Sequence, residues 1–147
     1  MIPHKTKMSG RLVRKAKSVT NNFFLSILGY KDGFGSTVRF SDPQGCTAFG
    51  DGLAIADNNN HAVRIVTLDL HEVTTIVRKG GGGFADGVYT GSAYSGAGIY
   101  YPVFIEALNT SHLIVVHNTG QVRLIDTVNK MITTLISGID VSRLLLF

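Results

Sequence analysis

The feature that most constrains this 147-residue chain is an internal repeat. The segments at 63–65 (Val-Arg-Ile) and 73–77 (Val-Thr-Thr-Ile-Val) return at 122–124 (Val-Arg-Leu) and 132–136 (Ile-Thr-Thr-Leu-Ile). Both copies, and the pair Pro43 and Pro102, are separated by the same 59 residues. A constant separation predicts that everything from the proline to the last strand recurs without a gap. The chain is therefore expected to consist of copies of one small structural unit.

The repeated unit has the pattern of an all-β protein. Apolar residues alternate with polar ones, or run together, in short bursts that end at turn-forming residues. In the first unit we expect strands at 46–49, 53–56, 62–68 and 72–77, and in the second at 103–108, 113–116, 121–127 and 131–136. Four short antiparallel strands in succession predict one sheet for each unit.

The repeat also divides the chain. We expect a basic N-terminal tail at 1–10, the last two strands of a preceding unit at 11–28, and a first full unit at 29–77. A glycine-rich connecting loop follows at 78–101, and a second full unit at 102–136. The remaining residues, 137–147, are interpreted as the start of a further strand or a truncated end.

The first unit resembles an NHL repeat. The resemblance is carried by the segments 29–45, 53–66 and 73–77, and it extends over nearly all of the chain after residue 10. The Asn-His-Leu triplet that names the family is matched here by Asn60-His61-Ala62, whereas the second unit has Thr119-Gly120-Gln121 and also lacks the preceding Asp.

This resemblance implies β-propeller blades of four antiparallel strands. Propellers close with about four to eight blades, and this chain has about two and a half. The resemblance therefore implies an incomplete ring. The chain is then a fragment of a longer protein, a part that assembles with other copies, or an open arc; the apolar ending at 141–147 favours a fragment.

The basic residues are concentrated at one end. The net charge is +4, but residues 1–31 contain seven Lys or Arg and no acid, so residues 32–147 have a net charge of −3. The N-terminal charge suits a solvated edge, a phosphate or nucleic-acid contact, or an organelle-import sequence. An RNA-binding role is not favoured, because the repeats themselves lack the positive charge that phosphate binding requires.

A single cysteine, Cys46, excludes an internal disulfide framework and favours an intracellular, reducing compartment. No stretch approaches the roughly 20 apolar residues that a membrane-spanning helix needs. Asn109-Thr110-Ser111 is a glycosylation sequon, and its use depends on a secretion route that the sequence does not indicate.

The candidate binding residues come first from the polar loop after the second strand. Asp57, Asn58, Asn60 and His61 could line a site at the end of the sheet. The alternative, which we favour, is that these side chains bond to their own turn, as Asp and Asn commonly do.

The other candidates are repeated charges. Arg64 and Arg123 hold the same place in the two units and could form a ring of arginines that receives phosphate or carboxylate. We favour a structural pairing of each arginine with an aspartate of the preceding connector, Asp32 or Asp86.

The sequence indicates no catalytic centre, metal or cofactor. The histidine spacings match no ligand rule, and no arrangement of Ser, His and Asp or of paired carboxylates is apparent. We therefore expect a non-enzymatic interaction scaffold with a protein partner, self-association or further blades. The alternatives are an RNA-binding module, and a fragment of a propeller lyase or hydrolase.

Overall fold

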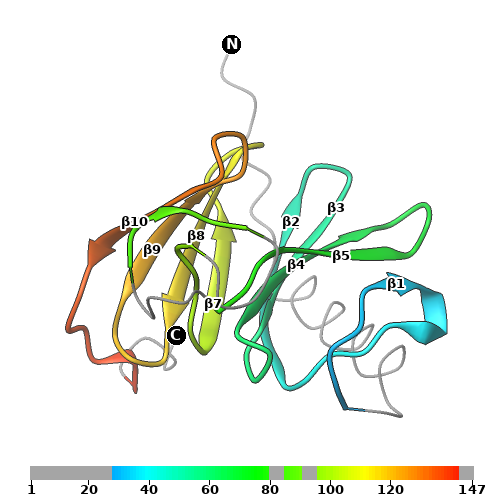
Figure 1. The fold of residues 1–147 in the computed structure, drawn as a ribbon, viewed down its shortest axis with the longest axis horizontal. Coiled ribbons are helices and arrows are strands. Elements are labelled where there is room, and N and C mark those ends of the chain that lie inside the picture. Colours follow the sequence, from blue (N-terminus) through cyan, green and yellow to red (C-terminus); the bar gives the residue numbers. More distant parts are fainter. Residues whose placement is uncertain (1–27, 80–84, 91–95, 143–147) are drawn as a thin grey trace.

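The computed structural model describes residues 28–79, 85–90 and 96–142. In this part of the chain the fold is all-β, with a short 3₁₀ helix, η1 (Gly35–Thr37), before β2 (Pro43–Phe49). Two antiparallel five-stranded sheets lie side by side (Figure 1), and they form no closed ring among the described residues. These residues also include no helix that is long and apolar enough to cross a membrane. The expected tail at 1–10 and nearly all of the partial blade at 11–28 lie outside the described residues.

The first sheet contains β1 (Gly33–Phe34), β2 (Pro43–Phe49), β3 (Gly52–Asp57), β4 (Ala62–Thr67) and β5 (Glu72–Val77). Its strand order is β1-β5-β4-β3-β2. The turns between strands use left-handed backbone conformations, at Gly50 between β2 and β3, at His61 before β4 and at His71 before β5.

The second sheet repeats this design with β6 (Gly87–Val88), β7 (Pro102–Ala107), β8 (His112–His117), β9 (Val122–Asp126) and β10 (Met131–Ile136). Its order is β6-β10-β9-β8-β7. Left-handed residues recur at Gly120 and Lys130, each 59 positions after its counterpart in the first sheet, His61 and His71.

The expectation of four strands in each sheet was wrong by one strand. Gly33 pairs with Val73 and so adds β1 to the outer edge of β5, and Gly87 pairs with Ile132 and adds β6 to β10. A two-residue strand that begins with glycine has no periodic pattern. Its pairing depends on where the connector lies in the folded chain. Within the segment 78–101, residues 87 and 88 therefore belong to a sheet.

The expectation of a repeat without a gap was also wrong, because β8 is displaced by one residue. Gly45 pairs with Ala56 in the first sheet, but Phe104 pairs with Val116 in the second, where a constant separation requires residue 115. Counted between paired residues, the loop from Ala107 to Leu113 is one residue longer than its counterpart from Ala48 to Leu53. The loop from Val116 to Val122 is one residue shorter than its counterpart from Ala56 to Val63. The two changes cancel, so the separation of 59 is restored at β9.

The main core lies between the two sheets. One face of the first sheet packs against the second sheet through buried aliphatic residues from both: Ala54, Ala56, Val63 and Val77 from the first, and Ile105, Leu113, Val115, Ile125 and Ile132 from the second. At Gly45 a Cβ atom would lie 3.2 Å from backbone atoms of Val103, Phe104 and Ile105. Glycine there lets β2 approach β7 closely.

The outer faces of the two sheets differ. The outer face of the first sheet is covered, with Val38, Phe40, Ile55 and Val73 in a second buried cluster. The second sheet has instead a partly exposed apolar surface, which we call the open face. The partly exposed residues of the open face, read from the strand register, are Phe104, Ile114, Val122, Leu124 and Ile136.

Candidate functional site

Arg64 is the centre of a buried polar network in the first sheet. Its side chain is 0% exposed. Nη2 donates to Asp32 Oδ1 (2.7 Å), Nη1 donates to Asp57 Oδ2 (3.1 Å), and Nε donates to Asp32 Oδ1 (3.1 Å). The carbonyl oxygens of Lys31 and Arg39 accept further bonds from the two terminal nitrogens. Each guanidinium nitrogen is satisfied, which is the arrangement that a buried arginine requires.

Asp57 is fully buried and receives several donors besides Arg64. Its Oδ1 accepts the backbone N–H of Ser41 (2.9 Å), and its Oδ2 accepts the amide of Asn60 (2.8 Å). Burial raises the pKa of this carboxyl, although the bonds from Asn60, Ser41 and Arg64 act in the opposite direction. The network therefore links the loop between β3 and β4 to the segment between η1 and β2, which contains Ser41.

Asn58 and His61 join the two sheets. The Asn58 amide donates to the Pro102 carbonyl oxygen (3.1 Å), and the backbone N–H of Tyr101 donates to His61 Nδ1 (3.1 Å). The His61 ring stacks on Tyr100, with ring centres 4.5 Å apart, and meets Tyr101 edge-on. These contacts hold the loop after β3 against the start of β7.

Two cations, Arg78 and Lys79, lie near enough to His61 to affect its charge. Lys79 Nζ lies 4.8 Å from the ring centre of Tyr100, and the Arg78 guanidinium lies 3.6 Å from that of Tyr30. Desolvation, followed by the charges of Lys79 and Arg78, lowers the pKa of His61. His61 is therefore a neutral ring that packs and accepts a hydrogen bond.

Arg123 occupies the same place in the second sheet with fewer partners. Its side chain is 0% exposed, and its Nη2 donates to Asp86 Oδ1 (3.0 Å) and to the Ala85 carbonyl oxygen (2.8 Å). Nη1 donates to the Gly98 carbonyl oxygen (3.2 Å), while Nε has no partner in the described part of the chain. Desolvation lowers the pKa of Arg123, against the effect of Asp86.

His117 stands where the first sheet has Asp57. Pro43 pairs with Asp57, and Pro102 pairs with His117, so the displacement of β8 brings the histidine to the aspartate's register position. His117 is 0% exposed. Desolvation, assisted by the charge of Arg123, lowers its pKa to about 3, so it is neutral at pH 7. The second cluster thus has one carboxylate where the first has two.

The eight candidate residues therefore form two separate clusters. Asp32, Asp57, Asn58, Asn60, His61 and Arg64 lie together in and beside the first sheet, and Asp86 and Arg123 pair in the second. Both arginine–aspartate pairs that the sequence analysis favoured are present. A binding role for these eight residues remains a prediction.

The fold also assembles a group that sequence reasoning missed. Ser111 Oγ lies 2.9 Å from His112 Nδ1, and His112 Nε2 lies 3.6 Å from Asp126 Oδ2. The serine hydroxyl, however, also lies 3.0 Å from Asn109 Oδ1 and donates to it. Asn109 Oδ1 accepts the backbone N–H groups of Ser111 and His112 as well, which is the geometry of an Asx turn.

No sequence signal could have identified this group, because it depends on the pairing of His112 with Asp126 across β8 and β9. A nucleophilic serine must give its proton to the histidine. Here the Ser111 hydroxyl donates to Asn109 Oδ1 of the turn instead. The described residues also contain no set of three or more His, Cys, Asp or Glu that could hold a metal ion.

Comparisons with known proteins give little further information. No known protein family matches the sequence, and no curated protein matches it. Among solved structures, the fold is similar to an auxiliary nutrient-binding protein from Bacteroides thetaiotaomicron, with a TM-score of 0.49 and 20% sequence identity. The match covers 72% of this chain and 25% of the other, so the chain spans about a quarter of that protein. A likeness at this level carries no argument about function.

Proposed function

We propose that this chain is a non-enzymatic protein-interaction module built from NHL-type β-propeller blades, and that its open face binds a second copy of the chain. The observation that supports this proposal is the exposure of apolar side chains on the open face. Ile136 is 52% exposed and Phe104 is 46% exposed. Apolar side chains gathered on one face of a sheet are typical of an interaction surface.

The repeat shows what the open face lacks. Val63 and Val77 hold the positions of Val122 and Ile136 in the first sheet, and both are 0% exposed because the second sheet covers them. The chain thus already contains one sheet-on-sheet interface made by this face of the repeat. A second copy brings a further sheet with the same apolar character.

Sheet-on-sheet packing fits the chemistry of the surface. Facing sheets pack about 10 Å apart through interdigitated apolar side chains. Covering a half-exposed Phe104 or Ile136 contributes about 1 kcal/mol each. Glu106 on the same face is exposed and lies toward the first sheet, where Thr47 Oγ1 donates to its Oε1 (3.4 Å). The charge therefore stands beside the first sheet.

The polar clusters support a binding role over catalysis. Asp32, Asp57 and Arg64 bond to one another, and Arg123 bonds to Asp86 and backbone carbonyls. Groups that are buried and mutually bonded stabilise the sheets and are poorly placed to reach a substrate. The arginine and aspartate positions that recur in both units thus stabilise the fold. The open face, which differs between the two sheets, is available for binding a partner.

Sedimentation velocity of the full chain at increasing concentration tests this proposal. We expect reversible association into dimers, and we expect Ile136→Glu and Phe104→Glu to leave the chain monomeric. Leu68→Glu is the matched control, because Leu68 is 55% exposed in the turn between β4 and β5, away from the open face. A wild-type chain that stays monomeric throughout, or a dimer that survives Ile136→Glu, would overturn the proposal.

A further inference from the structure

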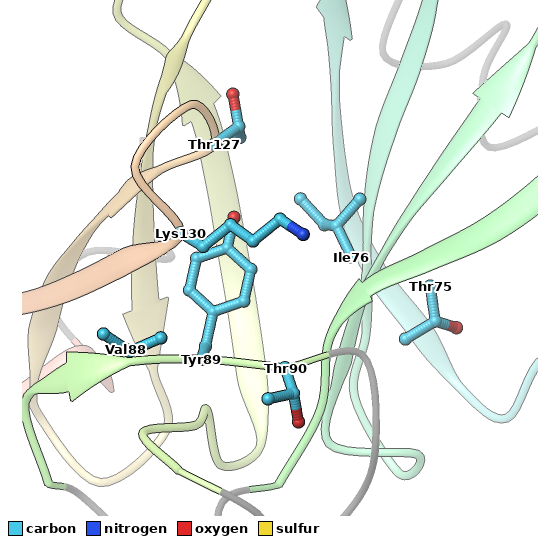
Figure 2. A pocket seen from close by; sticks show the side chains of 7 residues that line it. All are labelled: Thr75, Ile76, Val88, Tyr89, Thr90, Thr127 and Lys130. Atoms are coloured by element: carbon cyan, nitrogen blue, oxygen red, sulfur yellow. The ribbon is translucent and has the colours of Figure 1, made fainter.

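A pocket of about 460 Å³ lies between the two sheets. It is formed where β5 of the first sheet faces the segment after β6 and the turn before β10 (Figure 2). The lining residues are Thr75, Ile76, Val88, Tyr89, Thr90, Thr127 and Lys130. This volume is within the range of pockets that hold small molecules.

Lys130 gives the pocket a positive charge that no described lining residue neutralises. Figure 2 shows the Lys130 side chain extending past the ring of Tyr89 toward Ile76 of the other sheet. The described residues that line the pocket include no carboxylate. Within the described part of the chain, the Lys130 ammonium makes no ion pair and no hydrogen bond. Lys130 thus presents three donors above an apolar surface formed by Ile76, Val88 and Tyr89.

The hydroxyl groups of the lining already have partners. Tyr89 Oη donates to the Asp126 carbonyl oxygen (3.3 Å), and Thr127 Oγ1 donates to the Ser111 carbonyl oxygen (2.9 Å). Burial, followed by the charge of Asp126, raises the pKa of Tyr89 to about 12, so its phenol is neutral and does not act as a counter-ion for Lys130. The exposed Lys130 ammonium therefore has no counter-ion among the described lining residues, and a ligand can reach it from solvent.

The repeat does not require these residues. The backbone N–H of Tyr89 donates to the Lys130 carbonyl oxygen (2.9 Å), as the N–H of Gly35 donates to that of His71 (3.1 Å) in the first sheet. Lys130 and His71 also share the left-handed conformation, with φ of 54° and 50°. The same turn therefore forms with Gly35 and His71 in the first sheet, so the turn itself does not require a tyrosine and a lysine.

From these observations we infer that the pocket binds a small carboxylate with an apolar body, such as an aryl-alkyl carboxylate. The carboxylate pairs with the Lys130 ammonium, and the body lies against Ile76, Val88 and the ring of Tyr89. This pocket is separate from the open face, so the inference does not depend on self-association.

Calorimetric titration of the full chain with 4-phenylbutyrate, and with its neutral amide, tests the inference. We expect the carboxylate to bind and the amide to bind at least fivefold more weakly. Lys130→Met should weaken carboxylate binding at least fivefold and bring it level with the amide, while Lys130→Arg should restore it. Lys31→Met is the matched control, because it removes the same charge from an exposed side chain outside the pocket.

A second measurement locates the ligand. In two-dimensional NMR spectra we expect 4-phenylbutyrate to shift the signals of Ile76, Val88 and Tyr89 in the wild type. The inference would be overturned by no binding of 4-phenylbutyrate, by equal affinity for acid and amide, or by shifts confined to residues outside the pocket. Equal affinity in the wild type and in Lys130→Met would do the same.

Discussion

The two sheets are built to one plan but differ in how they hold the buried arginine. In the first, Arg64 bonds to two carboxylates, Asp32 and Asp57, and every nitrogen of its guanidinium has a partner. In the second, Arg123 bonds to the carboxylate of Asp86 and two carbonyl oxygens, and its Nε has no partner in the described residues. The comparison shows that the repeat needs the arginine and its connector aspartate, while the second carboxylate can be replaced.

The replacement has an electrostatic consequence. A fully buried carboxylate such as Asp57 is tolerated because a cation and several donors face it. His117 at the same register position is neutral and brings no charge to balance that of Arg123. The second arginine therefore depends more on Asp86, whose side chain is 48% exposed.

The largest expected effect comes from removing the arginine of each sheet. Arg64→Met leaves Asp57 buried without its cation, and we expect the free energy of unfolding to fall by about 3–5 kcal/mol. Arg123→Met leaves only the half-exposed Asp86, and we expect a loss of roughly 1–3 kcal/mol. Urea denaturation of the two variants measures the difference, and equal losses would contradict the assigned role of Asp57.

The second prediction concerns the faces of the sheets. Val77 is 0% exposed beneath the second sheet, whereas its counterpart Ile136 is 52% exposed. We expect Val77→Ala to cost about 2 kcal/mol of unfolding free energy, and Ile136→Ala to cost less than about 0.5 kcal/mol. Thermal unfolding at low protein concentration is the appropriate measurement. A cost at Ile136 as large as that at Val77 would mean that the open face is covered.

The third prediction is a pH dependence that belongs to the second sheet. The pKa of His117 is about 3 in the folded chain and near 6.5 in the unfolded one, so between these values only the unfolded chain binds the proton. The stabilisation is complete above about pH 6.5 and declines as the pH falls toward 3, by up to about 1.4 kcal/mol per pH unit.

His117→Asn should remove this contribution. The difference between variant and wild type, measured by urea denaturation from neutral to acidic pH, isolates it from the other titrating groups. A difference that does not change with pH would show that His117 takes up its proton as readily in the folded state.

The smallest expected effect distinguishes the connector aspartates. Thr75 Oγ1 donates to Asp32 and also accepts the Tyr30 hydroxyl, whereas Thr134 Oγ1 donates to Asp86 at the surface. Thr75→Val should cost about 1–2 kcal/mol and Thr134→Val about 0.5–1 kcal/mol.

The Thr134 variant has a second readout. Desolvation acts to raise the pKa of Asp86, but the Thr134 bonds and the Arg123 charge outweigh it and lower the pKa below its usual value. NMR titration should therefore show a higher pKa for Asp86 in Thr134→Val. An unchanged pKa would assign the shift to the backbone N–H and the arginine alone.

Much of the fold could be predicted from local pattern. Each of the eight long strands begins and ends within three residues of its expected bounds. Alternating apolar residues and Gly, Asn or Asp turns determine strands and turns through neighbouring residues alone. The pairing of Arg64 with Asp32, and of Arg123 with Asp86, could also be anticipated, because both members recur in the two units.

Other features required the folded chain. The two-residue strands β1 and β6 have no pattern of their own and exist only because a connector returns to the edge of β5 or β10. The displacement of β8 is invisible in the separation of 59 residues, since one insertion and one deletion cancel. The group of Ser111, His112 and Asp126, like the pocket at Lys130, joins segments that no spacing rule connects.

By itself the sequence determined a repeated all-β unit and the arginine–aspartate pair inside each copy, because periodicity and recurrence are properties of the chain. Only the tertiary structure decided which carboxylate or histidine faces each arginine, and which apolar face is left open. In a sheet, a shift of one residue moves a side chain to the opposite face. Packing against the neighbouring sheet then decides which face is buried.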